Sequence, residues 1–149
     1  MAKLWRAWVT KILIVDDNPL VRKMIRRMIE QHPDWTVCGE SADGREGILK
    51  HALLKPHITV MDFSMPEVNG LEAARQILMD QPSARILILS VEESSGLIEE
   101  VKKTGIKGFC SKNTMGVFFE AVETILRGEH YFHGQPNRTP GIPVDPLWE

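Results

Sequence analysis

Apolar runs alternate along the chain with segments in which apolar residues recur at helical spacing. The run Ile86-Leu87-Ile88-Leu89 is apolar at every position, which is typical of a strand buried on both faces of a parallel sheet. Strand and helix pairs joined by right-handed crossovers predict an α/β fold, a doubly wound parallel sheet in a three-layer sandwich. The expected strands are residues 11–15, 35–39, 58–62, 84–90 and 107–110, and the expected helices are residues 19–31, 44–54, 70–80, 94–104 and 113–127.

The first expected helix has clear start signals. Asn18 is a good N-cap and Pro19 fits the first helical position, because its fixed φ suits a helix and its missing N–H is not needed there. One stripe of the helix is apolar and is expected to face the core, namely Leu20, Val21, Met24, Ile25, Met28 and Ile29. The basic residues Arg22, Lys23, Arg26 and Arg27 are expected to face water, or to form a docking patch for a kinase.

Polar residues stand where the expected strands end. Asp16 and Asp17 follow the first strand, Asp62 ends the third, Ser90 ends the fourth and Lys112 follows the fifth. The carboxyl ends of parallel strands meet at one crevice where the strand order reverses, so we expect these side chains to lie together. Each pair of carboxylates would repel by about 4 kcal/mol at about 4 Å with an effective dielectric near 20.

A positive charge must therefore compensate the three carboxylates. Lys112 supplies one such charge, and the remaining deficit suits a divalent cation with oxygen ligands, Mg²⁺ in particular. The crevice is expected to accept a phosphoryl group on Asp62, with the metal neutralising charge and with Ser90 and Lys112 binding the phosphoryl oxygens. The simpler alternatives are that Asp16 and Asp17 only cap a helix, that Ser90 is a turn hydroxyl, and that Lys112 is solvated.

Together these residues resemble the receiver domain of two-component response regulators. The resemblance covers about residues 10 to 130 and rests on Asp16-Asp17, the loop MDFSMPEVNG around Asp62, Ser90, and Phe109 before Lys112 in GFCSKN. It implies that Asp62 takes the phosphoryl group from the phosphohistidine of a sensor histidine kinase. It also implies that Mg²⁺ is bound by Asp17, Asp62 and the backbone carbonyl of Ser64, with Asp16 mainly outside the direct ligand set.

The resemblance also implies a flavodoxin-like fold with the strand order 2-1-3-4-5. The segments HPDWTVCGESADGREG and GIKGFCSKNTMGVFFEAVETILRGEHYF are most similar to NarL/FixJ-like receivers, which precede a helix-turn-helix output domain. Val91 is a departure, because the family commonly has a small residue after the serine or threonine, and a branched side chain is expected to narrow access to Asp62.

A coupling mechanism follows from the charge that phosphorylation adds. The phosphoryl group on Asp62 would draw the Ser90 hydroxyl inward, and Phe109 would turn into the vacated space. The expected result is a repacked face of helix 94–104, strand 107–110 and helix 113–127, where a partner or a second copy would dock. We expect this face to include Leu97, Ile98, Val101 and Phe109; helices 19–31 and 113–127 form the competing dimer surface.

The domain boundaries predict an N-terminal extension over residues 1–10, a receiver over 11–130 and a proline-rich tail over 131–149. Two hypotheses remain open for how the receiver controls its downstream response. The favoured one is the receiver half of a helix-turn-helix transcription regulator, which would contact DNA only through an output domain absent from this chain. The alternative is a stand-alone receiver that acts through protein contacts.

Composition excludes some other classes. The net charge is −2 and the pI about 6.2, so no overall basic surface indicates nucleic acid or membrane as a partner. The N-terminal segment is too short for a signal-peptide core, and Cys38 and Cys110 lack metal-ligand spacing, so we expect a cytoplasmic protein with reduced cysteines.

Two enzyme-like or redox alternatives have specific requirements that this sequence does not meet. An FMN-binding flavodoxin needs a phosphate loop where Asp16 and Asp17 would repel the phosphate. A phosphatase with an aspartyl nucleophile needs a second aspartate where Ser64 stands. We therefore expect no enzyme in the usual sense, but a domain that catalyses only its own phosphorylation and dephosphorylation.

Overall fold

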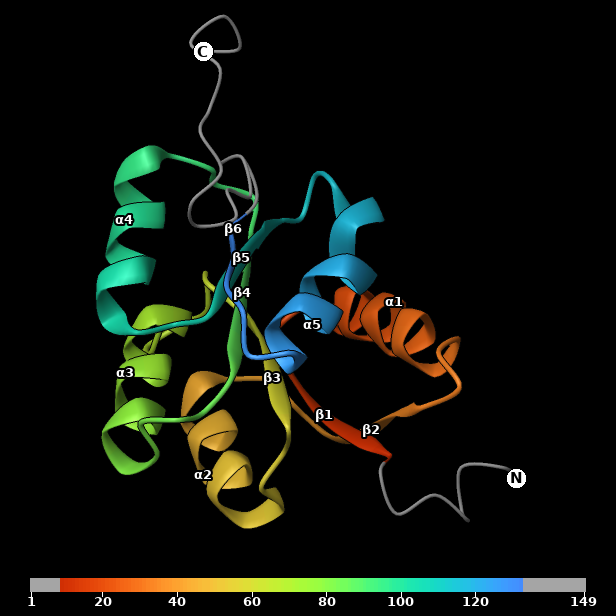
Figure 1. The fold of residues 1–149 in the computed structure, drawn as a ribbon. Coiled ribbons are helices and arrows are strands. Elements are labelled where there is room, and N and C mark those ends of the chain that lie inside the picture. The colour runs from red at the N-terminus through yellow and green to blue at the C-terminus, as the bar shows by residue number, and fades with distance from the viewer. Residues whose placement is uncertain (1–8, 133–149) are drawn as a thin grey trace, which may run out of the picture.

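A parallel six-stranded sheet forms the middle layer of the protein, in a computed structural model that describes residues 9–132 (Figure 1). The strand order is β2-β1-β3-β4-β5-β6, which confirms the predicted order 2-1-3-4-5 and extends it by one strand. The strands are β1 (Thr10–Val15), β2 (Trp35–Ser41), β3 (Ile58–Asp62), β4 (Ile86–Ser90), β5 (Gly108–Ser111) and β6 (Tyr131–Phe132). The helices are α1 (Pro19–Glu30), α2 (Gly44–Leu54), α3 (Gly70–Asp80), α4 (Ser95–Thr104) and α5 (Phe118–Leu126).

Helices cover both faces of the sheet, with α2, α3 and α4 on one side and α1 and α5 on the other (Figure 1). Residues of β1 alternate between two apolar cores: Leu13 and Val15 pack on the side of α2, α3 and α4, while Ile12 and Ile14 pack on the opposite side. Burying such a side chain stabilises the fold by roughly 1.5–3 kcal/mol. The continuous apolar runs predicted to be doubly covered strands are therefore confirmed.

Polar side chains begin four of the helices as caps. The Asn18 side chain accepts hydrogen bonds from the Leu20 and Val21 amides, and Asp43, Asn69 and Ser94 cap α2, α3 and α4 in the same way. A cap satisfies amide groups that have no partner within the helix. The predicted starts of these helices agree with the structure to within one residue.

The fifth helix begins later than predicted. Residues 113–127 were expected to be helical, but Met115–Val117 form a short 3₁₀ turn and α5 starts at Phe118. The Ser111 hydroxyl accepts from the Asn113 amide, and the Thr114 amide donates to the Ser111 carbonyl. These local bonds compete with helical ones, and Gly116 adds a residue that disfavours a helix.

The strand β6 lies within the segment assigned to the proline-rich tail. It pairs with β5 in parallel register, Gly108 opposite Tyr131 and Phe109 opposite Phe132. The sheet thus includes two residues beyond the boundary drawn at residue 130. The rest of the tail and most of the N-terminal extension lie outside the described residues.

Two residues of the predicted core stripe on α1 are exposed. Leu20 is 76% and Met24 41% accessible, whereas Ile25 and Ile29 are fully buried. The stripe was predicted too wide, because helical spacing gives the direction of a side chain and not whether the sheet extends beneath it. Val21 and Met28 are partly buried against the same core.

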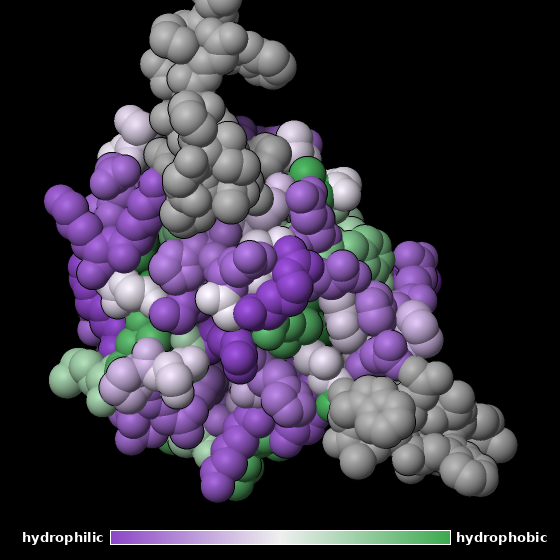
Figure 2. Space-filling view, in the orientation of Figure 1, coloured by the Kyte–Doolittle hydropathy of each residue, from purple (hydrophilic) through white to green (hydrophobic). Residues whose placement is uncertain are grey.

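The apolar residues expected at the face that phosphorylation repacks lie in the core of this structure. Leu97, Ile98, Val101 and Phe109 are all buried in this structure, so none of them is presented at the surface. Docking on this face after phosphorylation remains a prediction. The helical spacing of Leu97, Ile98 and Val101 places them on the inner side of α4, and the outer side of this helix is polar, as the left of Figure 2 shows. Phe109 is already inside, because a phenyl ring without a hydroxyl gains nothing from water.

Cys38 and Cys110 are free thiols, Cys110 is buried, and burial raises the pKa of its thiol to about 12. Within residues 9–132, no helix is both long and apolar enough to cross a membrane.

The close approach of α3 to β3 gives a stability prediction. We expect Gly70→Ala to lower the free energy of unfolding by about 1–3 kcal/mol, because the added methyl would lie 2.3 Å from the Asp62 carbonyl oxygen. Urea denaturation measures the change. The matched control is Gly96→Ala in α4, where nothing lies within 4 Å; it should raise the free energy by about 0.5–1 kcal/mol. Equal stabilities of the two variants would contradict the prediction.

Candidate functional site

The predicted strand-end residues come together at the carboxyl edge of the sheet. The Lys112 ammonium lies 2.9 Å from Asp16 Oδ2 and 2.9 Å from Asp62 Oδ1. Carboxylate oxygens of Asp16, Asp17 and Asp62 all lie within 4.8 Å of one another. The requirement that Asp17, Asp62 and Lys112 share one site is therefore met.

Backbone contacts hold Asp16 in place. Its amide donates to the Ser41 carbonyl at 3.0 Å, which joins the ends of β1 and β2. Its carboxylate accepts from the Asn18 amide at 2.8 Å, so the turn folds over the acid. Asp16 is buried while Asp17, the next residue, is exposed. The alternative that the pair only caps α1 does not fit Asp16, because its carboxylate bonds Lys112 across the sheet.

Asp62 is buried at the end of β3 and has two partners. Its Oδ1 atom accepts from the Ser64 amide at 3.3 Å and from Lys112. The Phe63 amide donates to the Leu89 carbonyl, and the Gly70 amide donates to the Phe63 carbonyl. The loop after Asp62 is thus tied both to β4 and to the start of α3.

Burial and charge shift the pKa values of this cluster. Burial raises the pKa of Asp62 to about 6, with a further increase from Asp16, while Lys112 acts against both. For Lys112, burial favours the neutral amine, but the hydrogen bonds and charges of Asp62 and Asp16 outweigh it and raise its pKa. One ammonium is therefore shared by two buried carboxylates, and the site keeps a negative charge.

The donor set suits a divalent cation. Three carboxylates offer hard oxygen atoms within a span of 4.8 Å, which matches the ligand preference of Mg²⁺ and similar ions. Asp17 stands at the exposed side of the cluster. The Ser64 amide donates to the Asp62 carboxylate. Metal binding by the Ser64 carbonyl remains a prediction.

Ser90 lies at the end of β4, beside Asp62 in the sheet, and is buried. Its hydroxyl accepts from the Glu92 amide at 3.0 Å, and its carbonyl accepts from the Lys112 amide at 2.8 Å. The hydroxyl therefore does stabilise a turn, as the simpler alternative requires. It also keeps its own hydrogen to donate, so the phosphate-binding prediction is compatible with this geometry.

Sequence reasoning missed two contributors to the edge of the site. Ser111 is fully buried opposite Ser90 in the register of β4 and β5. Asn113 donates from its side chain to the Val91 carbonyl at 3.3 Å, which links the loops after β4 and β5. The signal for Ser111 was present, since it ends a strand as Ser90 does.

The crowding of carboxylates gives a pH-dependent prediction. A raised pKa means that the folded protein binds the Asp62 proton more tightly than the unfolded chain, so stability is lost as pH rises from about 4 to about 6. In metal-free buffer at pH 8, Asp62→Asn should therefore raise the free energy of unfolding by about 1–3 kcal/mol. The gain should shrink toward pH 5, as measured by urea denaturation.

Asp17→Asn is the matched control, since Asp17 is exposed in the same cluster. Its effect should be smaller at both pH values. The prediction would be contradicted if Asp62→Asn lowered the free energy of unfolding by the same amount at pH 8 and at pH 5. That result would show that Lys112 fully compensates both acids.

Comparison with known proteins identifies the family. The model of the response regulator receiver domain matches residues 12–123. The transcriptional regulatory protein DegU of Brevibacillus brevis is 31% identical over 124 residues, which are 83% of this chain and 52% of DegU. The chemotaxis protein CheY of Thermotoga maritima is 37% identical over 102 residues, 68% of this chain and 84% of CheY. The chain spans about half the length of curated relatives such as DegU.

Solved structures agree with this assignment. A two-component response regulator of the LuxR family from Aurantimonas sp. SI85-9A1 has a TM-score of 0.80 and 34% identity, over 83% of this chain and 89% of that one. The receiver domain of RcsB from Salmonella enterica has a TM-score of 0.77 and 25% identity, over 84% and 94%. The chain therefore belongs to the response regulator receiver family, among its NarL/FixJ-like members.

Proposed function

We propose that this receiver accepts a phosphoryl group on Asp62 from the phosphohistidine of a histidine kinase, with Mg²⁺ as the required cation. The observation that carries the proposal is the position of Lys112, 2.9 Å from the carboxylates of both Asp16 and Asp62. A structural ion pair needs one acid and one base. Burying a second carboxylate beside the same lysine lowers the stability of the fold. A site that binds a cation and a phosphoryl group accounts for the presence of this second acid.

The chemistry is a transfer between two residues. An Asp62 carboxylate oxygen attacks phosphorus, an oxygen–phosphorus bond forms, and the bond from phosphorus to the imidazole nitrogen breaks with its electron pair going to nitrogen. Asp62 is the carboxylate needed for attack above its pKa of about 6. Bound Mg²⁺ would neutralise charge on the transferring oxygens. Asp17, Asp62 and the Ser64 carbonyl are the proposed ligands.

Lys112 and Ser90 are proposed to hold the product. Lys112 moves from the Asp62 carboxylate to a phosphoryl oxygen, and the Ser90 hydroxyl donates to another. In this proposal the chain promotes only its own phosphorylation and dephosphorylation.

The response to phosphorylation is proposed to pass through α4, β5 and α5. The Phe109 side chain is already buried in this structure, so phosphorylation has no exposed Phe109 side chain to turn inward. The phosphoryl group would instead draw Ser90 toward Asp62 and stabilise the inward Phe109. A homodimer formed on phosphorylation is one way in which this face would act.

The proposed output is transcription control. Relatives such as DegU are transcriptional regulators of which this chain covers about half, which supports a receiver that acts through a helix-turn-helix output domain outside this sequence. DNA would be contacted only by that domain. The alternative of a stand-alone receiver is supported by the similarity to CheY over 84% of its length.

Intact-mass measurement tests the acceptor directly. After incubation with Mg²⁺ and acetyl phosphate, the wild type should gain the mass of one phosphoryl group, and Asp62→Ala should gain none, because its acceptor oxygen is gone. Omitting Mg²⁺ should abolish the gain in the wild type. Modification of Asp62→Ala to the same extent would refute the assignment.

Access to Asp62 gives a second test. Val91 follows Ser90 and is exposed, and we expect its branched side chain to slow small phosphodonors. Val91→Ala should therefore be phosphorylated by acetyl phosphate severalfold faster than the wild type. Leu53→Ala, which shortens an exposed leucine on α2, is the control and should leave the rate unchanged. Equal time courses for Val91→Ala and the wild type would contradict the prediction.

A further inference from the structure

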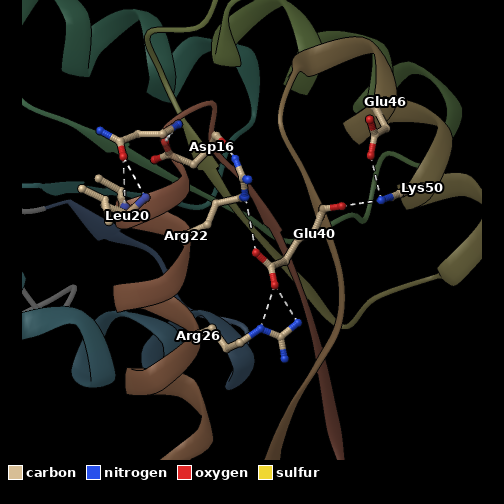
Figure 3. A network of polar contacts seen from close by, with 9 residues as sticks. Asp16, Leu20, Arg22, Arg26, Glu40, Glu46 and Lys50 are labelled. Atoms are coloured by element: carbon tan, nitrogen blue, oxygen red, sulfur yellow. Dashed lines mark hydrogen bonds and ion pairs between the residues drawn. The ribbon is translucent and has the colours of Figure 1, made fainter.

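A chain of charged side chains runs from the edge strand β2 to the acidic turn after β1 (Figure 3). Glu40 on β2 accepts from Arg26 Nε and lies 2.7 Å from Arg26 Nη2. The other Glu40 oxygen lies 3.4 Å from Arg22 Nε. Arg22 Nη1 then donates to the carbonyl oxygen of Asp16 at 2.6 Å. Two arginines one turn apart on α1 thus share one carboxylate, but the contact with the turn comes from Arg22.

The contacted carbonyl belongs to the peptide group that joins Asp16 to Asp17. Holding its oxygen sets the plane of that peptide and therefore the direction in which Asp17 leaves β1. The Asp16 side chain is held separately, by Lys112 and by the Asn18 amide. Among the described residues, no hydrogen bond or ion pair is found for the Asp17 carboxylate itself, so its place in the cluster depends on the backbone.

Burial separates Arg22 from an ordinary surface ion pair. Its side chain is 20% accessible, against 39% for Arg26. A bond from a charged donor to a backbone carbonyl is stronger than a neutral one, and Glu40 prevents the guanidinium from swinging into water. Lys50 also donates to the Glu40 carbonyl and pairs with Glu46, which ties this part of β2 to α2.

We propose that Arg22, anchored by Glu40, is a positioning residue that holds the Asp16–Asp17 turn in the shape required to bind a divalent cation. The proposal rests on the proposed function, because that function makes the turn a metal ligand. A positioning role and a purely electrostatic role of Arg22 predict opposite changes in cation affinity when Arg22 is removed. If Arg22 acts only as a positive charge near a cation site, its removal strengthens cation binding; if it positions the turn, its removal weakens binding.

The first experiment measures the turn without metal. Backbone amide exchange of Asn18, which bonds the Asp16 carboxylate, is followed by NMR in the full chain. Arg22→Gln should raise the exchange rate of this amide about tenfold, through local opening of the turn. Arg26→Gln is the matched control, since it loses the same charge from the same Glu40; its rate should stay within about twofold of the wild type. Equal rates in the two variants would overturn the proposal.

The second experiment measures Mg²⁺ affinity by calorimetric titration of the same proteins. Arg22→Gln should weaken binding about tenfold, Arg22→Lys less because an ammonium can still reach the carbonyl, and Arg26→Gln hardly at all. Affinity in Arg22→Gln that equals or exceeds that of the wild type would overturn the proposal.

Failure of the proposed function gives a different result. In that case the wild type itself binds no Mg²⁺, and the role of Arg22 in positioning a metal-binding turn is also refuted. A tenfold change of the Asn18 exchange rate would then still show that Arg22 orders the turn, so the two failures are distinguishable.

Discussion

The rest of this structure depends on one ammonium group held between two buried carboxylates. Lys112 lies directly after β5, 96 residues from Asp16 in the chain, and its ammonium offsets part of the repulsion between Asp16 and Asp62 where the ends of β1, β3 and β5 meet. Burial raises the pKa of Asp62 to about 6 and the charge of Asp16 adds to the increase, although Lys112 acts against both. One ammonium does not neutralise two carboxylates. The residual negative charge makes the site receptive to a cation.

The same site is supported from the opposite edge of the sheet. Arg22 and Glu40 connect β2 to the turn that carries Asp16 and Asp17, and the Asp16 amide bonds the end of β2 directly. The strand ends from β2 to β5 thus all contribute, through a side chain, a peptide group or both. An open parallel sheet is suited to this, because its loops at the carboxyl edge are independent of the packing within the layers.

Sequence patterns predicted the sheet and the meeting of Asp16, Asp62 and Lys112, because apolar runs and strand-end residues depend on local spacing. The strand order was implied by the resemblance to receiver domains. Sequence patterns failed where burial or contact depends on which parts of the fold lie close together in space. Leu20 and Met24 share the spacing of buried residues but extend past the sheet, and the apolar stripe of α4 fits a core as well as a docking surface. The contact of Arg22 depends on Glu40, which approaches only after β2 pairs with β1.

The strand β6 ties the last described residues of the chain to β5. Phe132, the last described residue, stands opposite Phe109 on β5, and the Tyr131 amide donates to the Lys107 carbonyl. The last described residues are therefore held against the strand that carries the buried aromatic ring. A shift of β5 would move β6 with it through the hydrogen bonds that the two strands share, without any helix having to transmit the movement.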